Sequence, residues 1–467
     1  MLKKILIALL VVCFISGSNF MTVSAVTPSS YESGFQIRNL SSTTSATINI
    51  DFYNLDGVKV LSLADSVAAN STNTYFPLSD QLATGFKGSI IISSNQPVVS
   101  MSNLVGKNSS NSPISYASYS AFLSGSATVS VPLLMKNNYG YNTNLTVQNT
   151  GSISTDVNVN YSDGTSKSKI GLQPGASVTF DQATETHSQA VFSATISSTG
   201  SVPLAAVVIE VGPDTLFAYG GFGAGSTNPV MPLINENNYG YFTGVQIQNQ
   251  GSQSTQVTVA FTPAPGMPGT ACTEVRTIAA NSSTIFAQNV FTSSTDPATL
   301  ISTTCIRGAT FVGSGKVTTN STSQPLVAVV NQLNIGAKKG AAYMGFNPDA
   351  GKSKVVMPLI MDRNYGYFTS WSIVNVGGTT INSGDISCLV TGTDKSGASV
   401  SKTILSSTSL LSGGSWTLNH QNIISDGFVG GATCSGPVGS KLVGSVNQLA
   451  NSTIDSFLVY EGFSVDP

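Results

Sequence analysis

One stretch of about 20 residues occurs three times along the chain. It reads PLLMKNNYGYNTNLTVQNTGS from Pro132, PLINENNYGYFTGVQIQNQGS from Pro232 and PLIMDRNYGYFTSWSIVNVGG from Pro358. A fourth, shortened copy lies near the start, where residues 34–39 (GFQIRN) match residues 244–249 (GVQIQN) but the Asn-Tyr-Gly-Tyr segment is absent. A repeat of this length indicates similar modules, each folding around the same pattern.

Two further signatures recur in all four copies. A nine-residue block appears as VAANSTNTY, LQPGASVTF, IAANSSTIF and LLSGGSWTL, and a Tyr-x-x-Phe pair closes each copy. Gly- and Ser-rich connectors follow the pairs and mark domain boundaries. The predicted organisation is residues 1–25 as a signal peptide, then repeats over residues 26–122, 123–225, 226–350 and 351–467, the first of them truncated at its N-terminus.

The hydrophobic pattern within a copy has a period of two. Leu145, Val147 and Asn149 alternate with polar residues, and Gly151 begins the turn that follows. Such alternation indicates strands, and about seven short strands per 100 residues with frequent turns is typical of an immunoglobulin-like β-sandwich. We therefore expect an all-β chain of four tandem immunoglobulin-like β-sandwich domains, joined in a row.

The first 25 residues are typical of an export signal. Lys3 and Lys4 precede an apolar run, and small residues stand at Val23-Ser24-Ala25. This arrangement predicts a cleaved secretory signal, and no later stretch is apolar enough to span a bilayer. We expect a secreted protein or one at the cell surface, without a transmembrane segment in the mature chain.

The remaining cysteines fit an oxidising compartment. Cys272 and Cys305 lie within the third copy, and Cys388 and Cys434 within the fourth. An even number of cysteines in an exported chain predicts disulfides within each copy. The first pair flanks an insertion that it would tie down, and the second pair is expected to cross the sandwich core.

Composition excludes several classes of function. Charged residues are only 9% of the chain and the net charge is −2, so no basic field attracts nucleic acid. The two histidines, His187 and His420, have no Ser-His-Asp or metal-ligand spacing, and we expect both in solvated loops. We expect no catalytic residues, no metal, no cofactor and no enzymatic activity.

The Asn-Tyr-Gly-Tyr motif has two interpretations. In the structural one, glycine permits a tight turn and the tyrosine rings cover the end of a sandwich. In the functional one, exposed tyrosines stack on sugar rings beside polar side chains. The candidate glycan contacts are Tyr141, Tyr241 and Tyr367.

The truncated first copy suggests a site of assembly. If it lacks its first strand, a free sheet edge near residues 35–40 would accept a strand from another subunit. The candidate edge residues are Phe35, Ile37 and Asn39.

Other short elements support a family resemblance. Residues 85–89 (GFKGS), 96–99 (QPVV) and 427–431 (GFVGG), with the Leu-x-Pro-Gly-x-Ser-like block, resemble tandem Ig-like repeats of bacterial surface and secreted proteins over nearly the whole mature chain. The resemblance implies a structural or adhesive role outside the cell. We expect an exported protein that self-associates into a surface layer, fibre or stalk, with a glycan-binding or cell-adhesion protein as the alternative.

Overall fold

The computed structural model describes residues 27–78, 81–287, 291 and 299–466, so the predicted signal peptide lies outside the described residues. In this part the chain is almost entirely β-strand, with two short 3-10 helices, η1 (Thr199–Ser201) and η2 (Pro348–Ala350). The all-β multi-domain sandwich fold is confirmed. The described residues contain no helix with the length and hydropathy needed to cross a membrane.

Each repeat forms one β-sandwich. The first comprises β1 (Ser30–Asn39), β2 (Ala46–Asn54), β3 (Lys59–Val67), β4 (Thr72–Tyr75), β5 (Gly88–Ser94), β6 (Val98–Lys107) and β7 (Pro113–Ser120). The second comprises β8 (Thr128–Met135), β9 (Asn142–Asn149), β10 (Thr155–Tyr161), β11 (Ser166–Leu172), β12 (Ser177–Asp181), β13 (Val191–Ser198), β14 (Leu204–Val211) and β15 (Leu216–Gly220). The third comprises β16 (Val230–Glu236), β17 (Phe242–Asn249), β18 (Thr255–Pro263), β19 (Cys272–Ile278), β20 (Ser283–Phe286), β21 (Leu300–Thr303), β22 (Phe311–Thr319), β23 (Leu326–Asn334) and β24 (Lys339–Met344). The fourth comprises β25 (Lys354–Asp362), β26 (Tyr367–Asn375), β27 (Ser387–Thr393), β28 (Ser399–Leu405), β29 (Ser415–Asn419), β30 (Phe428–Ser435), β31 (Leu442–Ala450), β32 (Leu458–Glu461) and β33 (Phe463–Val465).

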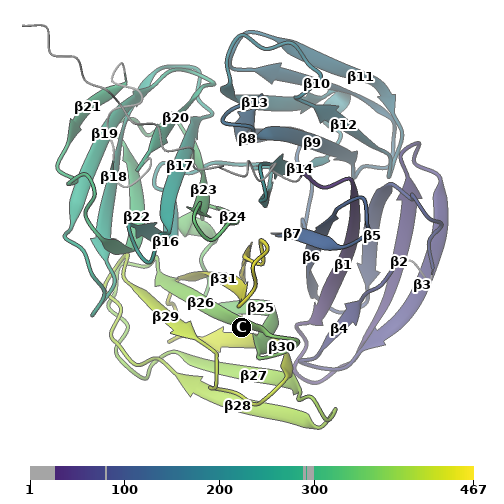
Figure 1. The fold of residues 1–467 in the computed structure, drawn as a ribbon, viewed down its shortest axis with the longest axis vertical. Helices are drawn as coiled ribbons and strands as arrows, with labels where there is room; N and C mark the ends of the chain where they lie inside the picture. Colours follow the sequence, from purple (N-terminus) through teal and green to yellow (C-terminus); the bar gives the residue numbers. More distant parts are fainter. Residues whose placement is uncertain (1–26, 79–80, 288–290, 292–298, 467) are drawn as a thin grey trace, which may run out of the picture.

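The second sandwich shows the common topology. One sheet has the order β11-β10-β13-β8 and the other β12-β9-β14-β15, with every pair antiparallel. We call the first the outer sheet and the second the inner sheet, because β10 and β11 lie at the rim of the molecule and β14 lies nearer its centre (Figure 1). In β10, buried residues alternate with more exposed ones, as a sheet with one face on the core requires.

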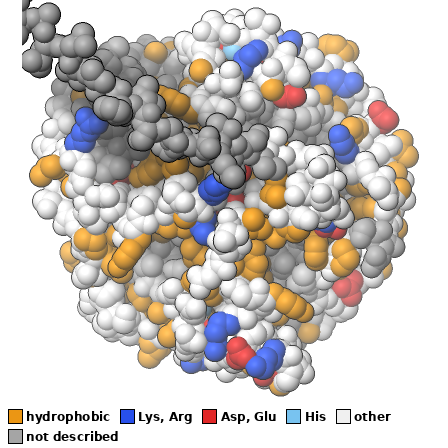
Figure 2. All heavy atoms as spheres, viewed as in Figure 1, with side chains coloured by type: hydrophobic (Ala, Val, Ile, Leu, Met, Phe, Trp, Pro, Cys, Tyr) orange, Lys and Arg blue, Asp and Glu red, His pale blue; other side chains and the backbone are white. Residues whose placement is uncertain are grey.

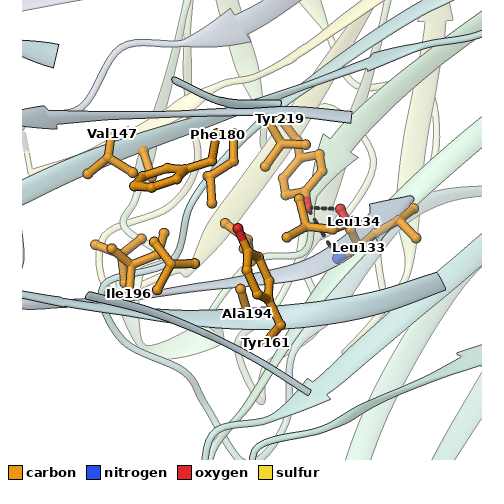
Figure 3. Close-up of a cluster of buried hydrophobic side chains, with 14 of the residues drawn as sticks. Leu133, Leu134, Val147, Tyr161, Phe180, Ala194, Ile196 and Tyr219 are labelled. Atoms are coloured by element: carbon orange, nitrogen blue, oxygen red, sulfur yellow. Dashed lines mark hydrogen bonds between the residues drawn. The ribbon is translucent and has the colours of Figure 1, made fainter. Parts of the chain in front are cut away.

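A tyrosine hydroxyl completes the core of this sandwich. The strand β8 bulges at Pro132 and Leu133, so the Leu133 peptide leaves the ladder. The hydroxyl of Tyr219 donates to the Leu133 carbonyl at 2.5 Å and accepts from the Leu133 N–H at 3.1 Å (Figure 3). Tyr343 and Tyr460 repeat these bonds with Leu233 and Leu359. These three closing tyrosines therefore belong to the core, and each one fastens the first strand of its sandwich.

The four sandwiches close into a ring (Figure 1). Their last β-hairpin strands, β7, β15, β24 and β32, meet around a central axis, each contacting the next and β32 contacting β7. Equivalent positions make equivalent junctions, since Gln248 donates to the Ala194 carbonyl of the second sandwich at 3.2 Å and Arg38 donates to the Thr433 hydroxyl of the fourth at 3.3 Å. The modules therefore do not lie in a row, because the last copy packs on the first as the second packs on the third.

The first sandwich lacks one strand. Its outer sheet has only three strands, in the order β3-β2-β5, and no counterpart of β8 is present among the described residues. The predicted edge at Phe35, Ile37 and Asn39 is wrong, because these residues lie in β1, which pairs with β4 on one side and β6 on the other. All three are buried. The unpaired edge belongs to β5, whose only described partner is β2.

Both predicted disulfides are present. Cys272 in β19 bonds to Cys305, just after the extra edge strand β21, and so ties down the insertion as expected. Cys388 and Cys434 face each other on the neighbouring strands β27 and β30. The expectation that this pair crosses the core is therefore wrong, because it links two strands of one sheet.

Candidate functional site

The Asn-Tyr-Gly-Tyr motif forms a two-residue hairpin turn. Asn138 and Tyr141 exchange both backbone hydrogen bonds, at 3.0 and 2.9 Å, with Tyr139 and Gly140 between them. Tyr139 has a φ of 50° and Gly140 of 86°, the left-handed pair of a type I′ turn. Asparagine normally occupies the first of these positions, since a tyrosine there is strained. The same geometry recurs at Tyr239 and Tyr365.

The two tyrosines of each motif have different environments. The first ones are the hairpin tips, and Tyr139, Tyr239 and Tyr365 are 87%, 94% and 96% exposed. Sequence reasoning missed them, although a Tyr-Gly pair between two residues that could exchange hydrogen bonds was the available signal. We call these three residues the tyrosine tips.

The second tyrosines, named above as glycan contacts, instead pack toward the ring axis. The Tyr141 ring meets Phe217 edge to face at 5.8 Å and its hydroxyl lies 2.7 Å from the Thr215 hydroxyl. Tyr241 packs on Phe457 of the next sandwich. Partial burial, with the nearby Asp455 carboxylate, raises the pKa of Tyr241 to about 12. These rings follow the structural interpretation of the motif.

Tyr367 makes the corresponding contact across the closing junction. Its ring meets Tyr116 of the first sandwich at 6.1 Å, nearly perpendicular to it. Burial and the Tyr116 hydroxyl raise the pKa of Tyr367. The three second tyrosines therefore connect the base of each hairpin to the central strands, and so fix the position of the tip above them.

A buried carboxylate joins three sandwiches at the axis. Asp455, from the fourth sandwich, accepts the N–H of Leu216 at 3.0 Å, of Gly340 at 3.1 Å and of Phe457 at 3.4 Å. Leu216 belongs to the second sandwich and Gly340 to the third. Desolvation outweighs these hydrogen bonds and raises the pKa of Asp455 to about 8.

Two more buried carboxylates connect neighbouring sandwiches. Glu461 accepts the Met344 N–H of the third sandwich at 2.5 Å and the Ser120 hydroxyl of the first at 2.8 Å. Glu210 accepts the Asn331 amide at 2.7 Å, and burial raises its pKa to about 8. The ring is thus held by specific polar contacts as well as by apolar packing, which makes it a rigid base for the hairpins.

The ring geometry places the tips on one side of the molecule. Because the sandwiches are related by approximate rotation about one axis, equivalent turns lie at a similar height along that axis. Figure 2 shows that one face of the ring carries only scattered charges among polar and apolar side chains. The three tips therefore occupy equivalent exposed positions of their sandwiches, and the partly exposed Arg363 lies two residues before Tyr365.

Neither histidine lies in a solvated loop, so that expectation is wrong. His187 Nδ1 lies 3.0 Å from Asp163 Oδ2, and its ring stacks on Phe192. Its Nε2 faces Glu185 at 3.8 Å, and the Thr165 hydroxyl lies 3.2 Å from its Nδ1. His420 is buried beside Thr369, and desolvation lowers its pKa to about 3. Within the described ranges, no group of three or more His, Cys, Asp or Glu side chains could hold a metal ion.

A shallow polar depression lies between the second and third sandwiches. Its volume is about 360 Å³, and its lining includes Asn160, Ser162, Thr195, Asn281 and Ser282. Its described lining carries serine, threonine and tyrosine hydroxyls but no carboxylate, histidine or cysteine.

Comparison of the chain with models of known protein families gives no match, and comparison with curated protein sequences gives none either. The function is therefore inferred from the geometry of the tyrosine tips and of the ring.

Proposed function

We propose that the protein is an exported adhesion protein whose ring presents the tyrosine tips to carbohydrate at a cell surface. The export signal, the two disulfides and the resemblance to repeats of bacterial surface proteins support a location outside the cell. The scarcity of charge suits a neutral ligand.

One observation carries the proposal. Three copies hold a tyrosine in a strained left-handed conformation with its ring almost completely exposed. Asparagine or glycine would form the same turn with less strain, and an exposed ring contributes little to packing. Strain of this kind is concentrated at functional sites, and an aromatic ring with a hydroxyl offers both a stacking face and a hydrogen-bonding group to a sugar.

Three tips carried by one ring would strengthen the weak contact that each tyrosine makes with a sugar. A single ring stacked on one sugar binds weakly, but three rigidly spaced tips engage a repeating polymer together and raise the overall affinity by their effective concentration. Three tips on one base therefore favour a polymeric carbohydrate over a single sugar.

The test is a glycan array probed with the mature protein, residues 26–467. The variant Tyr139→Asn/Tyr239→Asn/Tyr365→Asn should keep the fold and lose binding. A matched control replaces exposed aliphatic residues of the same three sandwiches with serine; these are Ile170, Ile306 and Leu411. The control should bind as the parent does. Equal binding by the tip variant and the parent would refute the proposal.

Self-association into a surface layer is the second candidate. It is favoured by the low charge, because neutral surfaces pack against each other without electrostatic repulsion. A closed ring suits a layer of discs better than a stalk of modules in a row. Light scattering across a range of protein concentration tests it, and a constant monomer mass would exclude it.

A further inference from the structure

Three of the four junctions are filled by a first strand. The strand β8 pairs with β13 of its own sandwich and lies against β17 and β23 of the next one. The strands β16 and β25 take the same place at the two following junctions, where Val230 packs on Val374 and Val443, and Val356 packs on Val99. The first strand therefore completes an outer sheet and seals the junction to the next inner sheet.

The junction between the first and second sandwiches has no such strand. Ile90 and Ile92 of β5 point toward the core of the first sandwich but remain partly exposed. The equivalent residues of the second sandwich, Ala194 and Ile196, are fully buried beneath β8.

The inner sheet of the second sandwich, on the other side of this junction, also has residues that are less buried than their counterparts in the third sandwich. Val207 in β14 is partly exposed, whereas the equivalent Val329 is fully buried against the core of the second sandwich. Gln148 in β9 is also partly exposed as a residue, and its amide nitrogen is buried without a hydrogen-bond partner among the described residues, whereas Gln248 donates to a carbonyl of the preceding sandwich. Both walls of this junction are therefore less covered than their counterparts.

Tyr119 of the first sandwich lacks the backbone partner that its three counterparts have. Tyr219, Tyr343 and Tyr460 each bond to the backbone of a first strand. Tyr119 closes the first copy at the equivalent position, but the described residues provide no such backbone there; the residue is partly exposed, and its hydroxyl has a side-chain hydrogen bond with Ser102 instead. A strand beside β5 would offer Tyr119 the peptide group that its counterparts bind.

The edge of β5 carries no protection against pairing. Its sequence, GSIIISS, has no charge and no proline. Three of the other outer-sheet edge strands carry lysine, namely Lys59 in β3, Lys169 in β11 and Lys402 in β28, whereas β21 of the third sandwich does not. Lysine on an edge strand discourages pairing with another chain, so the lack of it on β5 leaves this edge open to a strand.

We propose that this junction accepts an extended strand from another exported polypeptide, antiparallel to β5. The other first strands define its chemistry as seven to nine residues, mostly uncharged, with aliphatic side chains toward the core and a bulge in the middle. Backbone hydrogen bonds to β5 supply affinity, and the pockets at Ile90, Ile92 and Tyr119 supply selectivity. The nearest described residues of the same chain do not fill the place, since Ser29 still pairs with Lys107 of β6.

The test uses a fluorescent peptide of residues 126–136, SATVSVPLLMK, which contains the first strand of the second sandwich. Val129 and Val131 are its core-facing residues. Fluorescence anisotropy with the exported protein should show saturable binding, accompanied by a higher melting temperature. A control peptide with lysine at both valine positions should not bind. A self-complemented variant, with residues 126–136 linked ahead of Thr27, should melt higher than the parent and lose peptide binding.

Three results would overturn the proposal. One is equal binding, or no binding, of both peptides. Another is binding to the mature chain, residues 26–467, but not to the full chain that keeps residues 1–25, which would identify the protein's own N-terminal residues as the occupant. The last is a dimer in light scattering that the parent peptide dissociates, which would identify a second copy.

Discussion

Two tyrosines of the same motif should respond to mutation in opposite directions. Tyr365 is 96% exposed and left-handed, whereas Tyr367 packs on Tyr116 across the closing junction. A left-handed side chain costs roughly 1–2 kcal/mol, and asparagine relieves about half of that. The exposed ring of Tyr365 buries so little area that its loss costs about 0.2 kcal/mol. Tyr365→Asn should therefore raise the free energy of unfolding by about 0.5 kcal/mol.

Tyr367→Asn should instead lower the free energy of unfolding. Most of this ring is buried, so its removal costs about 2–3 kcal/mol from lost apolar area and the lost aromatic contact. Both tryptophans of the chain, Trp371 and Trp416, lie in the fourth sandwich, so tryptophan fluorescence during urea unfolding reports on that sandwich. A loss of more than 1 kcal/mol in Tyr365→Asn, or no loss in Tyr367→Asn, would refute the assignment of tip and anchor.

Three further changes test the ring. The pKa of Asp455 is about 8 in the folded protein and near 4 in the unfolded chain, so only the folded state holds this proton between about pH 4 and pH 8. The free energy of unfolding should therefore fall as pH rises through this range. Asp455→Asn should flatten that dependence when it is measured by calorimetry. The described partners of the buried Arg38 guanidinium are threonine hydroxyls, and burial lowers its pKa to about 10. The third copy has glutamine at the equivalent position, Gln248, so Arg38→Gln should change the free energy of unfolding in urea by less than about 1 kcal/mol. A loss above about 3 kcal/mol would show that the charge is needed. Replacing Cys272 and Cys305 with serine removes a disulfide that closes a loop of 33 residues and should lower the free energy of unfolding by about 4 kcal/mol. Thermal unfolding measures this loss, and the reduced parent should unfold as the variant does.

The sequence predicted what depends on local pattern. Alternating residues such as Leu145 and Val147 identified the strands, because burial on one face of a sheet requires a period of two. The repeat identified four sandwiches, and cysteine positions within copies identified both disulfide partners. The hairpin at residues 138–141 was also recognisable, since glycine at its third position permits the left-handed turn.

What the sequence could not supply depends on contacts between distant copies. The exposed and the buried tyrosine of a motif differ only in whether a neighbouring sandwich covers the ring, and Phe457 and Tyr116 are far away in sequence. The free edge was placed on β1 because the missing strand precedes it in the chain. In the sandwich, however, a first strand pairs with the sixth strand rather than the second, so its loss exposes β5.

The missing strand also determines where the ring is weakest. Closure between the fourth and first sandwiches is well packed, because β25 and β33 cover Val99 and the Arg38 side chain is buried beside Thr433. The junction between the first and second sandwiches is continuous in sequence yet lacks its sealing strand. The amides of β5 should therefore exchange with deuterium faster than those of β13, and binding of a strand there should slow them. A ligand that seals this junction would stabilise the whole ring, since each central strand contacts both of its neighbours.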